Sequence, residues 1–422
     1  MSYKANIASN LINQLLRLVL GLATSILVAR ALGPEGQGYV AYIVLIFTLI
    51  GSYGHFGLNN AVMYFHKRKG IDASHLYHVN STCLFIIFIA LSGLTLGAWH
   101  SGLWLRDYAL VWVLGGLLFV LAEFYYNNHY AWFIASERIR ESNRVNLLVL
   151  VLKSLFVMAF WLLGTLGTGH WFWITVLALC LNAILLQIRL KRGFGFKWDT
   201  SLLKDEFAYG GIVFLAAAFD HLHLRVDQLF IKNMLGIPQL GVYSMAVNLS
   251  ELMFLIPLSI NTALTGRLYN SEEGDSGRMV TARTLKLTLY VCIILSIIGI
   301  PLSFAIPWIY GEGFRGAILP TIILLVGVIF ASIARVAAPY FFTSGRPKVH
   351  LRVTLLSLLL NCLLNWLLIP LWGIRGAAIA SAISYFFYGI YYLSVLVVKE
   401  KFQLRDFLRL RMSDINAVLR KP

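Results

Sequence analysis

The sequence predicts an all-α protein that crosses a membrane about twelve times. Three observations predict this fold class: the composition, the length of the apolar segments and the placement of the charges. Of the 422 residues, 59% are hydrophobic and only 13% are charged, whereas soluble domains carry about 25% charged residues. A surface of this composition suits lipid better than water.

Twelve apolar segments separated by polar or Gly/Pro-rich breaks provide the spans. A helix needs roughly 17–25 apolar residues to cross a bilayer, and most of the segments have this length. The predicted spans are residues 10–31, 39–59, 79–99, 108–133, 146–166, 171–187, 208–231, 242–264, 287–310, 318–342, 353–369 and 377–398.

The positions of the cationic residues test this count. With the N-terminus placed in the cytoplasm, 26 of the 35 Lys and Arg residues fall on the cytoplasmic side, five on the other side and four within helices. Cytoplasmic loops of membrane proteins are rich in Lys and Arg, so both termini are predicted to be cytoplasmic. The net charge of +16 therefore reflects topology, and we expect no nucleic-acid partner. The external connections are too short for a catalytic domain.

The sequence contains no motif that indicates a cofactor or a metal. Cys83, Cys180, Cys292 and Cys362 each lie within an apolar segment, without the spacing of metal ligands, and are expected to be buried apolar side chains. No phosphate-binding loop is present, so ATP is not expected to drive the protein directly. The first apolar segment is longer than a signal peptide requires, and we expect it to be an uncleaved helix.

Two loops suggest an internal repeat. Gly33 and Gly38 follow the first span, and Gly236 and Gly241 follow the seventh, in each case 203 residues later. Six helices separate the loops, so both halves have the same orientation in the membrane and form a parallel repeat. The expected organisation is a six-helix bundle over residues 1–190, a cytoplasmic linker over 191–207, a second six-helix bundle over 208–398 and a basic cytoplasmic tail over 399–422. The tail either lies along the inner membrane surface or is disordered.

Eight charged residues fall within the predicted spans, where each costs about 2.5–3.5 kcal/mol at a helix centre. Such residues are expected to face a polar cavity or one another. Guanidinium groups bind phosphate oxygens in pairs, so the cations are candidates for binding an anionic cargo. The four cations are Arg17, Lys153, Arg225 and Arg335. For Arg17 and Lys153, the alternative is that the side chain reaches the inner headgroups.

The seventh span carries the densest group of titratable residues. On a continuous helix Asp220, His223 and Asp227 would share one face, with His221 and Arg225 on the next. The first interpretation is a cavity wall where these groups exchange protons. The alternative is a buried ion-pair network, for example between His223 and Asp227. The candidates for ion coupling are Asp220, His223, Asp227, Glu123 and Glu251, and H⁺, Na⁺ or the membrane potential would each fit.

Three segments resemble the polysaccharide flippases (Wzx-type) of the multidrug/oligosaccharidyl-lipid/polysaccharide exporter superfamily. They are ILVARALGPEGQGYVAY, DQLFIKNMLGIPQLGVYSMAVNLSELMFLIP and LIPLWGIRGAAIASAISYFFYGIYYL. The resemblance implies two six-helix bundles facing each other in a V, with a central cavity that opens to each side in turn. The implied cargo is an undecaprenyl-pyrophosphate-linked oligosaccharide, moved to the outer leaflet of the bacterial inner membrane for O-antigen, capsule or exopolysaccharide assembly.

The resemblance also implies partners and leaves alternatives. The implied partners are the lipid-linked oligosaccharide, the bilayer and other membrane proteins of polysaccharide assembly. Lipid II flippases carry an Arg-Asp pair where this sequence has Thr24 and Ser25, and have two further helices, which argues against lipid II as cargo. A drug or cation exporter of the same superfamily is the nearest alternative. A membrane enzyme such as a polysaccharide polymerase is the alternative from a different class.

Overall fold

The computed structural model describes residues 3–136, 138–193, 195–254, 275–343 and 346–403, and in these ranges the chain is helical. The chain divides into two compact units, Met1–Phe214 (unit 1) and Leu215–Pro422 (unit 2). The division into bundles and a linker expected from the sequence stays a prediction. Three expected segments fall partly outside the described residues: 255–264 of the eighth span, 265–274 of the connection after it, and 404–422 of the tail.

Unit 1 begins with a helix that contains two of the predicted spans. α1 runs over Tyr3–Tyr53, but Gly33 lies within it at φ 62° and ψ −176°, so two helices meet there at a kink. Glycine adopts this conformation without the steric penalty of a Cβ, and Pro34 suits the first turn of the helix that follows. The other elements of unit 1 are α2 (Leu58–Met63), the π-helical η1 (Tyr64–Arg68), α3 (Ala73–His100), α4 (Leu110–Ala135), α5 (Ile139–Leu162), α6 (Thr168–Leu190) and the first part of α7 (Thr200–His223).

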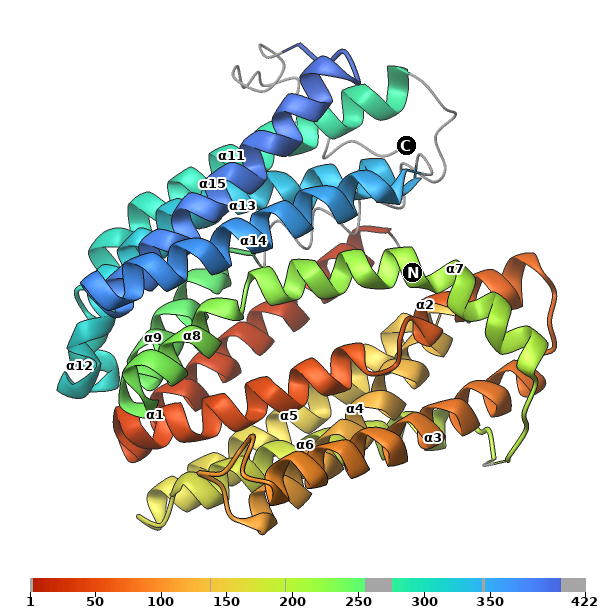
Figure 1. The fold of residues 1–422 in the computed structure, drawn as a ribbon, viewed down its shortest axis with the longest axis horizontal. Coiled ribbons are helices and arrows are strands. Elements are labelled where there is room, and N and C mark those ends of the chain that lie inside the picture. Colours follow the sequence, from red (N-terminus) through yellow and green to blue (C-terminus); the bar gives the residue numbers. More distant parts are fainter. Residues whose placement is uncertain (1–2, 137, 194, 255–274, 344–345, 404–422) are drawn as a thin grey trace. The chain divides into compact units, whose positions relative to one another are not determined.

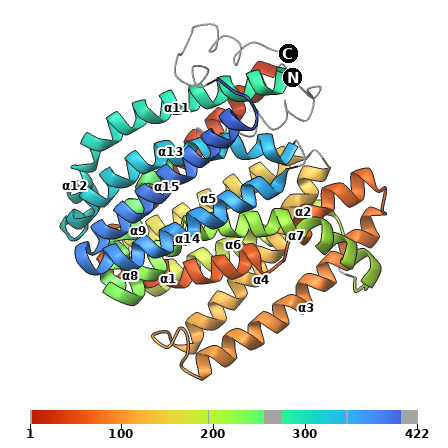
Figure 2. The same ribbon diagram turned by 45° about the horizontal axis from the view of Figure 1, so that its top comes forward.

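Unit 2 contains the end of α7 and the remaining helices. They are α8 (Val226–Leu235), α9 (Ile237–Glu251), η2 (Leu252–Phe254), α11 (Asp275–Ser303), α12 (Ile306–Tyr310), η3 (Glu312–Ala317), α13 (Ile318–Thr343), α14 (Pro347–Trp372) and α15 (Ile374–Val398). α13 packs against α11 and α15, and α14 packs against α15. Figures 1 and 2 show α13, α14 and α15 side by side. Their apolar contacts centre on buried residues such as Leu285, Phe341 and Tyr392.

The predicted seventh span, residues 208–231, is not one continuous helix. It breaks between α7 and α8, where Arg225 has φ −129° and ψ −13°. A helix end exposes backbone carbonyls that need donors, and Asn361 Nδ2 of α14 donates to the carbonyl oxygen of His223 at 2.8 Å. The break lies between His223 and Asp227, yet the side chains of Asp220, His223 and Asp227 all contact α15. The three residues therefore lie on two helices rather than one, but they still face the same neighbour.

The two units repeat one packing pattern. In unit 1, α6 packs against α4 and α5, and α1 packs against the same two helices; in unit 2, α15 packs against α13 and α14, α9 against α13, and α8 against α14. Gly236, between α8 and α9, has φ 89° and ψ −179°, close to the values of Gly33. The loops that suggested a repeat in the sequence thus share a backbone conformation that glycine favours.

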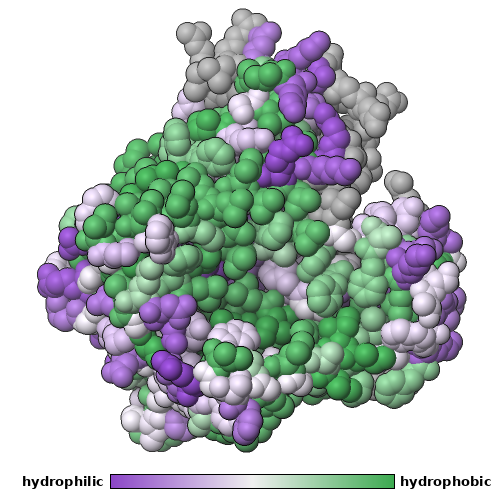
Figure 3. Space-filling view, viewed as in Figure 1, coloured by the Kyte–Doolittle hydropathy of each residue, from purple (hydrophilic) through white to green (hydrophobic). Residues whose placement is uncertain are grey.

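Nine helices among the described residues are long and apolar enough to cross a membrane, and the first of these spans, Leu16–Tyr53, runs through the kink at Gly33. Apolar side chains cover most of the helical surface in Figure 3, and hydrophilic side chains gather toward helix ends. Many outward side chains are large and apolar: Leu94 of α3 is 71% exposed and Leu162 of α5 is 70% exposed. Surfaces of this kind belong in lipid, and the expectation of an all-helical multi-pass membrane protein is confirmed.

Candidate functional site

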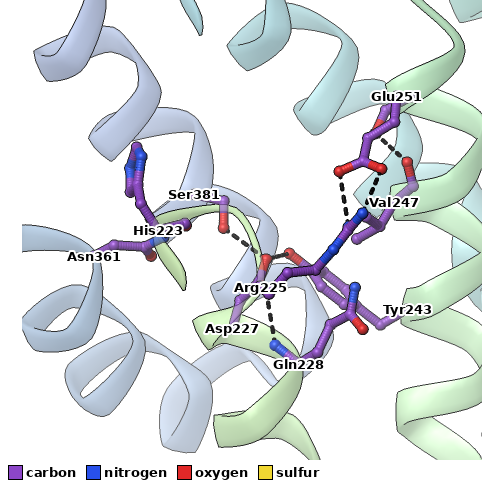
Figure 4. A network of polar contacts seen from close by, with 10 residues as sticks. His223, Arg225, Asp227, Gln228, Tyr243, Val247, Glu251, Asn361 and Ser381 are labelled. Atoms are coloured by element: carbon purple, nitrogen blue, oxygen red, sulfur yellow. Dashed lines mark hydrogen bonds and ion pairs between the residues drawn. The ribbon is translucent and has the colours of Figure 1, made fainter. Parts of the chain in front are cut away.

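The two cations predicted within the spans of unit 2, Arg225 and Arg335, each lie beside an acid. Arg225, at the start of α8, donates from Nη1 to Glu251 Oε1 at 2.7 Å and from Nη2 to Glu251 Oε2 at 2.8 Å. Figure 4 shows the guanidinium of Arg225 pointing at the carboxylate of Glu251, which lies at the end of α9. Two parallel hydrogen bonds of this type fix both partners. The donors of Arg225 that would reach a phosphate are directed at a carboxylate of its own unit.

The second cation of unit 2 also has an acidic partner. Arg335 of α13 lies with Nη1 3.4 Å from Asp220 Oδ2, and its guanidinium lies over the ring of Phe254 at 5.2 Å. Tyr388 of α15 donates to the other oxygen of Asp220 at 2.6 Å. Asp220 thereby joins α7 to α13 and α15.

Asp227 and His223 lie in a buried hydrogen-bond network. Asp227 is 1% exposed, and it accepts hydrogen bonds from Tyr243 at 2.5 Å, Ser381 at 2.9 Å and the backbone N–H of Gln228 at 2.8 Å. His223 Nε2 lies 3.1 Å from the hydroxyl of Ser384. Figure 4 shows Asp227 directed at these donors. Asp227 and His223 thus contact different partners through hydrogen bonds, and the example of an ion pair between them is not found among the described contacts.

Three residues of α15 that complete this network were not predicted from the sequence. Ser381, Ser384 and Tyr388 occur at helical spacing in SAISYFFY, and all three face α7 or α8 through the contacts above. A polar stripe of this kind on an otherwise apolar span was the available signal. A second signal for a polar network was the spacing of Asn361 and Asn365, one helical turn apart within an apolar segment. In the structure both lie on α14 and are fully buried.

The cations of unit 1 have a different environment. Arg17 Nη2 donates to the carbonyl oxygen and to Oδ1 of Asn143, at 3.2 and 3.4 Å. Lys153 Nζ lies over the ring of Trp171 at 4.4 Å, and the neighbouring Ser154 contacts Thr24 of α1 at 2.9 Å. Over the described part of the chain, neither cation lies within 4.0 Å of a carboxylate. Arg17 of α1 therefore contacts α5, and Lys153 of α5 lies against α6, each with neutral partners.

Glu123 of α4 is a buried acid of unit 1. It accepts a hydrogen bond from Ser52 at 2.5 Å, and its second oxygen is buried with no hydrogen-bond partner among the described residues. A Cβ on Gly51 would lie 2.4 Å from that oxygen, so only glycine leaves room for the carboxylate. The ion-coupling candidates thus differ in kind: Glu123 has neutral neighbours, whereas Asp220 and Glu251 each face an arginine.

The part of the chain that the structure describes holds no group of three His, Cys, Asp or Glu residues that could bind a metal. The fold and these enclosed charges define a multi-pass membrane protein with polar groups placed inside two helical units.

Comparisons with known proteins assign the family. The model of the family described as polysaccharide biosynthesis protein matches residues 3–269, and the model described as MatE matches residues 221–367. The chain belongs to the polysaccharide biosynthesis protein family. A putative O-antigen transporter of Shigella flexneri is 23% identical over 409 residues, which cover 91% of this chain and 95% of the relative.

Solved structures show the same fold. The lipid II flippase MurJ in an inward closed conformation superposes with a TM-score of 0.71 at 13% identity, covering 97% of this chain and 91% of that one. An inward-facing multidrug resistance MATE family transporter superposes with a TM-score of 0.65 at 13% identity, covering 91% and 94%. The resemblance found in the sequence is confirmed, as is the expectation of a multi-pass transporter of polysaccharide biosynthesis rather than an enzyme.

Proposed function

We propose that the protein moves undecaprenyl-pyrophosphate-linked oligosaccharide repeat units from the inner to the outer leaflet of the bacterial inner membrane. The proposal includes twelve spans in two six-helix bundles, a V-shaped central cavity that opens to each side in turn, and cytoplasmic termini. The product serves O-antigen, capsule or exopolysaccharide assembly. The family and the name of the Shigella relative support this class of cargo.

The observation that carries the proposal is the pair of cations in unit 1. Arg17 and Lys153 have neutral partners within the described residues, so a cargo anion would not have to displace a carboxylate to reach them. Arginine binds phosphate in pairs of hydrogen bonds, and lysine adds a compact positive charge. We therefore place the pyrophosphate contact at Arg17 and Lys153. Arg225 and Arg335 hold unit 2 together instead.

The residue for ion coupling is chosen in the same way, by whether its partners are charged or neutral. Glu123 combines burial with neutral partners, so gain or loss of a proton or Na⁺ there breaks no ion pair. Asp220, Asp227, His223 and Glu251 are engaged in contacts within unit 2. We assign the coupling role to Glu123 and a structural role to the other four.

The test measures lipid-linked repeat units in cells that lack the chromosomal gene and carry variants of this chain. Each hydrogen bond to a charged group contributes about 1.5–3 kcal/mol, so Arg17→Ala or Lys153→Ala should lower flipping roughly 10- to 100-fold. Unflipped intermediate should accumulate while the variant protein remains in the membrane. Lys204→Ala, at an exposed lysine of α7, is the matched control and should behave as wild type.

Normal surface polysaccharide with the double variant Arg17→Ala/Lys153→Ala would contradict the assignment of these cations. The match of residues 221–367 to the MatE model favours one rival, a drug or cation exporter. Normal polysaccharide in the deletion strain, together with increased drug sensitivity, would favour that rival.

A further inference from the structure

A buried acid outside the set discussed so far joins α7 to α3. Glu206 of α7 and Asn80 of α3 are both fully buried. Asn80 Nδ2 donates to Glu206 Oε1 at 3.1 Å. The other two oxygens of this pair, Glu206 Oε2 and Asn80 Oδ1, are buried and have no hydrogen-bond partner among the described residues.

The protonation state of Glu206 decides whether these oxygens are satisfied. An ionised carboxylate and an amide oxygen are both acceptors only, so the charged form leaves two buried acceptors unpaired, which is unfavourable. A proton on Oε2 turns it into a donor for Asn80 Oδ1. A second hydrogen bond of this kind would satisfy both residues, and the neutral form buries no charge.

The surrounding charges also favour the neutral acid. Asp199 precedes α7, and its carboxylate lies 3.0 Å from His75 Nε2. Cys83 of α3 is a further titratable neighbour, and Lys204 and Asp205, which precede Glu206 on α7, are exposed. Glu206 precedes the predicted span 208–231, in the predicted cytoplasmic connection. Burial raises the pKa of Glu206 to about 8, Asp199 adds to the increase, and the hydrogen bond from Asn80 opposes it.

Other contacts hold the first part of α7 and the segment before it against the other helices of unit 1. The backbone N–H of Lys197 donates to Thr82 Oγ1 at 3.1 Å, and the rings of Tyr209 and Tyr64 stack at 4.1 Å. A Cβ on Gly210 would lie 2.9 Å from the carbonyl oxygen of Gly57, so the backbones are in close contact there.

α7 continues beyond Phe214 into unit 2. The contacts above hold the first half of this helix against α3 and the other neighbouring parts of unit 1.

We propose that Glu206 is a proton-binding site, and that its neutral acid form fastens the start of α7 to α3 while loss of the proton releases it. A carboxyl whose pKa is raised in the docked state supports docking fully below its ordinary value of about 4.5. The equilibrium constant for docking falls about tenfold per pH unit between that value and the pKa of Glu206 in the docked state. The change thus falls across the pH range of the cytoplasm.

Hydrogen exchange of the purified full chain in lipid nanodiscs tests this proposal without any cargo. Peptides covering residues 197–211 are followed at about pH 5.5 and about pH 7.5, with correction for the intrinsic exchange rate. In the wild type, the equilibrium constant for opening of this segment should increase on the order of 100-fold from the lower to the higher pH. In Glu206→Gln the amide donates to Asn80 Oδ1 at every pH, so the segment should stay closed at both.

Two further variants complete the test. Asp205→Asn removes the exposed carboxylate next to Glu206 and should keep the wild-type pH dependence. Asn80→Ala removes the amide and should leave the segment open at both pH values. The proposal is overturned if Glu206→Gln shows the same pH dependence as the wild type, or if the segment of Glu206→Gln is open at both.

Discussion

Replacing Arg225 with Gln tests whether the Arg225–Glu251 pair holds unit 2 together. Breaking a buried ion pair costs about 3–5 kcal/mol, because the remaining charge has no partner. The side chains are 21% and 24% exposed, so water recovers part of this cost. We expect the free energy of unfolding to fall by about 2–4 kcal/mol for Arg225→Gln, and by a similar amount for Glu251→Gln.

Thermal unfolding of the purified protein, followed by tryptophan fluorescence, provides the assay. A loss of 1 kcal/mol lowers Tm by about 2–4 °C for a unit of roughly 200 residues, so each single variant should unfold roughly 5–15 °C earlier. The double variant Arg225→Gln/Glu251→Gln should recover a large part of the loss, since neither charge is left alone. Arg315→Gln is the matched control: its pair with Glu312 is 67% and 64% exposed, and no measurable shift is expected.

Two results would refute this reasoning. If Arg225→Gln is as stable as the wild type but inactive, then the arginine acts on the cargo and not on the fold. If the double variant is no more stable than the single variants, then the two side chains are not coupled.

Two further predictions concern packing and pH. Gly376→Ala should lower Tm by several degrees, because its Cβ would lie 2.1 Å from the backbone oxygen of Leu368, whereas Gly97→Ala on α3 has open space and should leave Tm unchanged; equal shifts would contradict the steric argument. Arg346 lowers the pKa of Glu400 through a pair of hydrogen bonds. The contact is therefore complete above about pH 4.5 and lost as pH falls through the lowered value. Hydrogen exchange of residues 396–403 should increase on acidification. In Arg346→Gln this acid-induced increase should be absent.

The helical segments could be predicted because each span carries its own signal. Segments 10–31 and 39–59 meet at Gly33, where the structure places the kink. The break before Arg225 had no local signal, since the donor that stabilises it is Asn361, 138 residues away. Arg335 and Asp220 are likewise 115 residues apart, beyond the reach of rules for neighbouring turns of one helix.

Glu206 was missed for a different reason. It lies in a segment that the charge pattern placed in a polar connection, so it was not among the membrane acids. The helical spacing of Leu202, Leu203, Glu206 and Gly210, all buried, was the available signal for a packed face. Its significance depends on Asn80, which only the fold brings near.

The unequal pairing of charges in the two units matters for redesign. Within the described residues, Arg225 and Arg335 of unit 2 are tied to acids, so random substitution around them mostly selects for proteins that still assemble. A library aimed at a new cargo should therefore vary the surroundings of Arg17 and Lys153 on α1, α5 and α6. Suppressors that restore assembly to weakened variants should instead accumulate around Asp220, Asp227 and Glu251. A screen that scores protein level and polysaccharide output separately would sort mutations by unit.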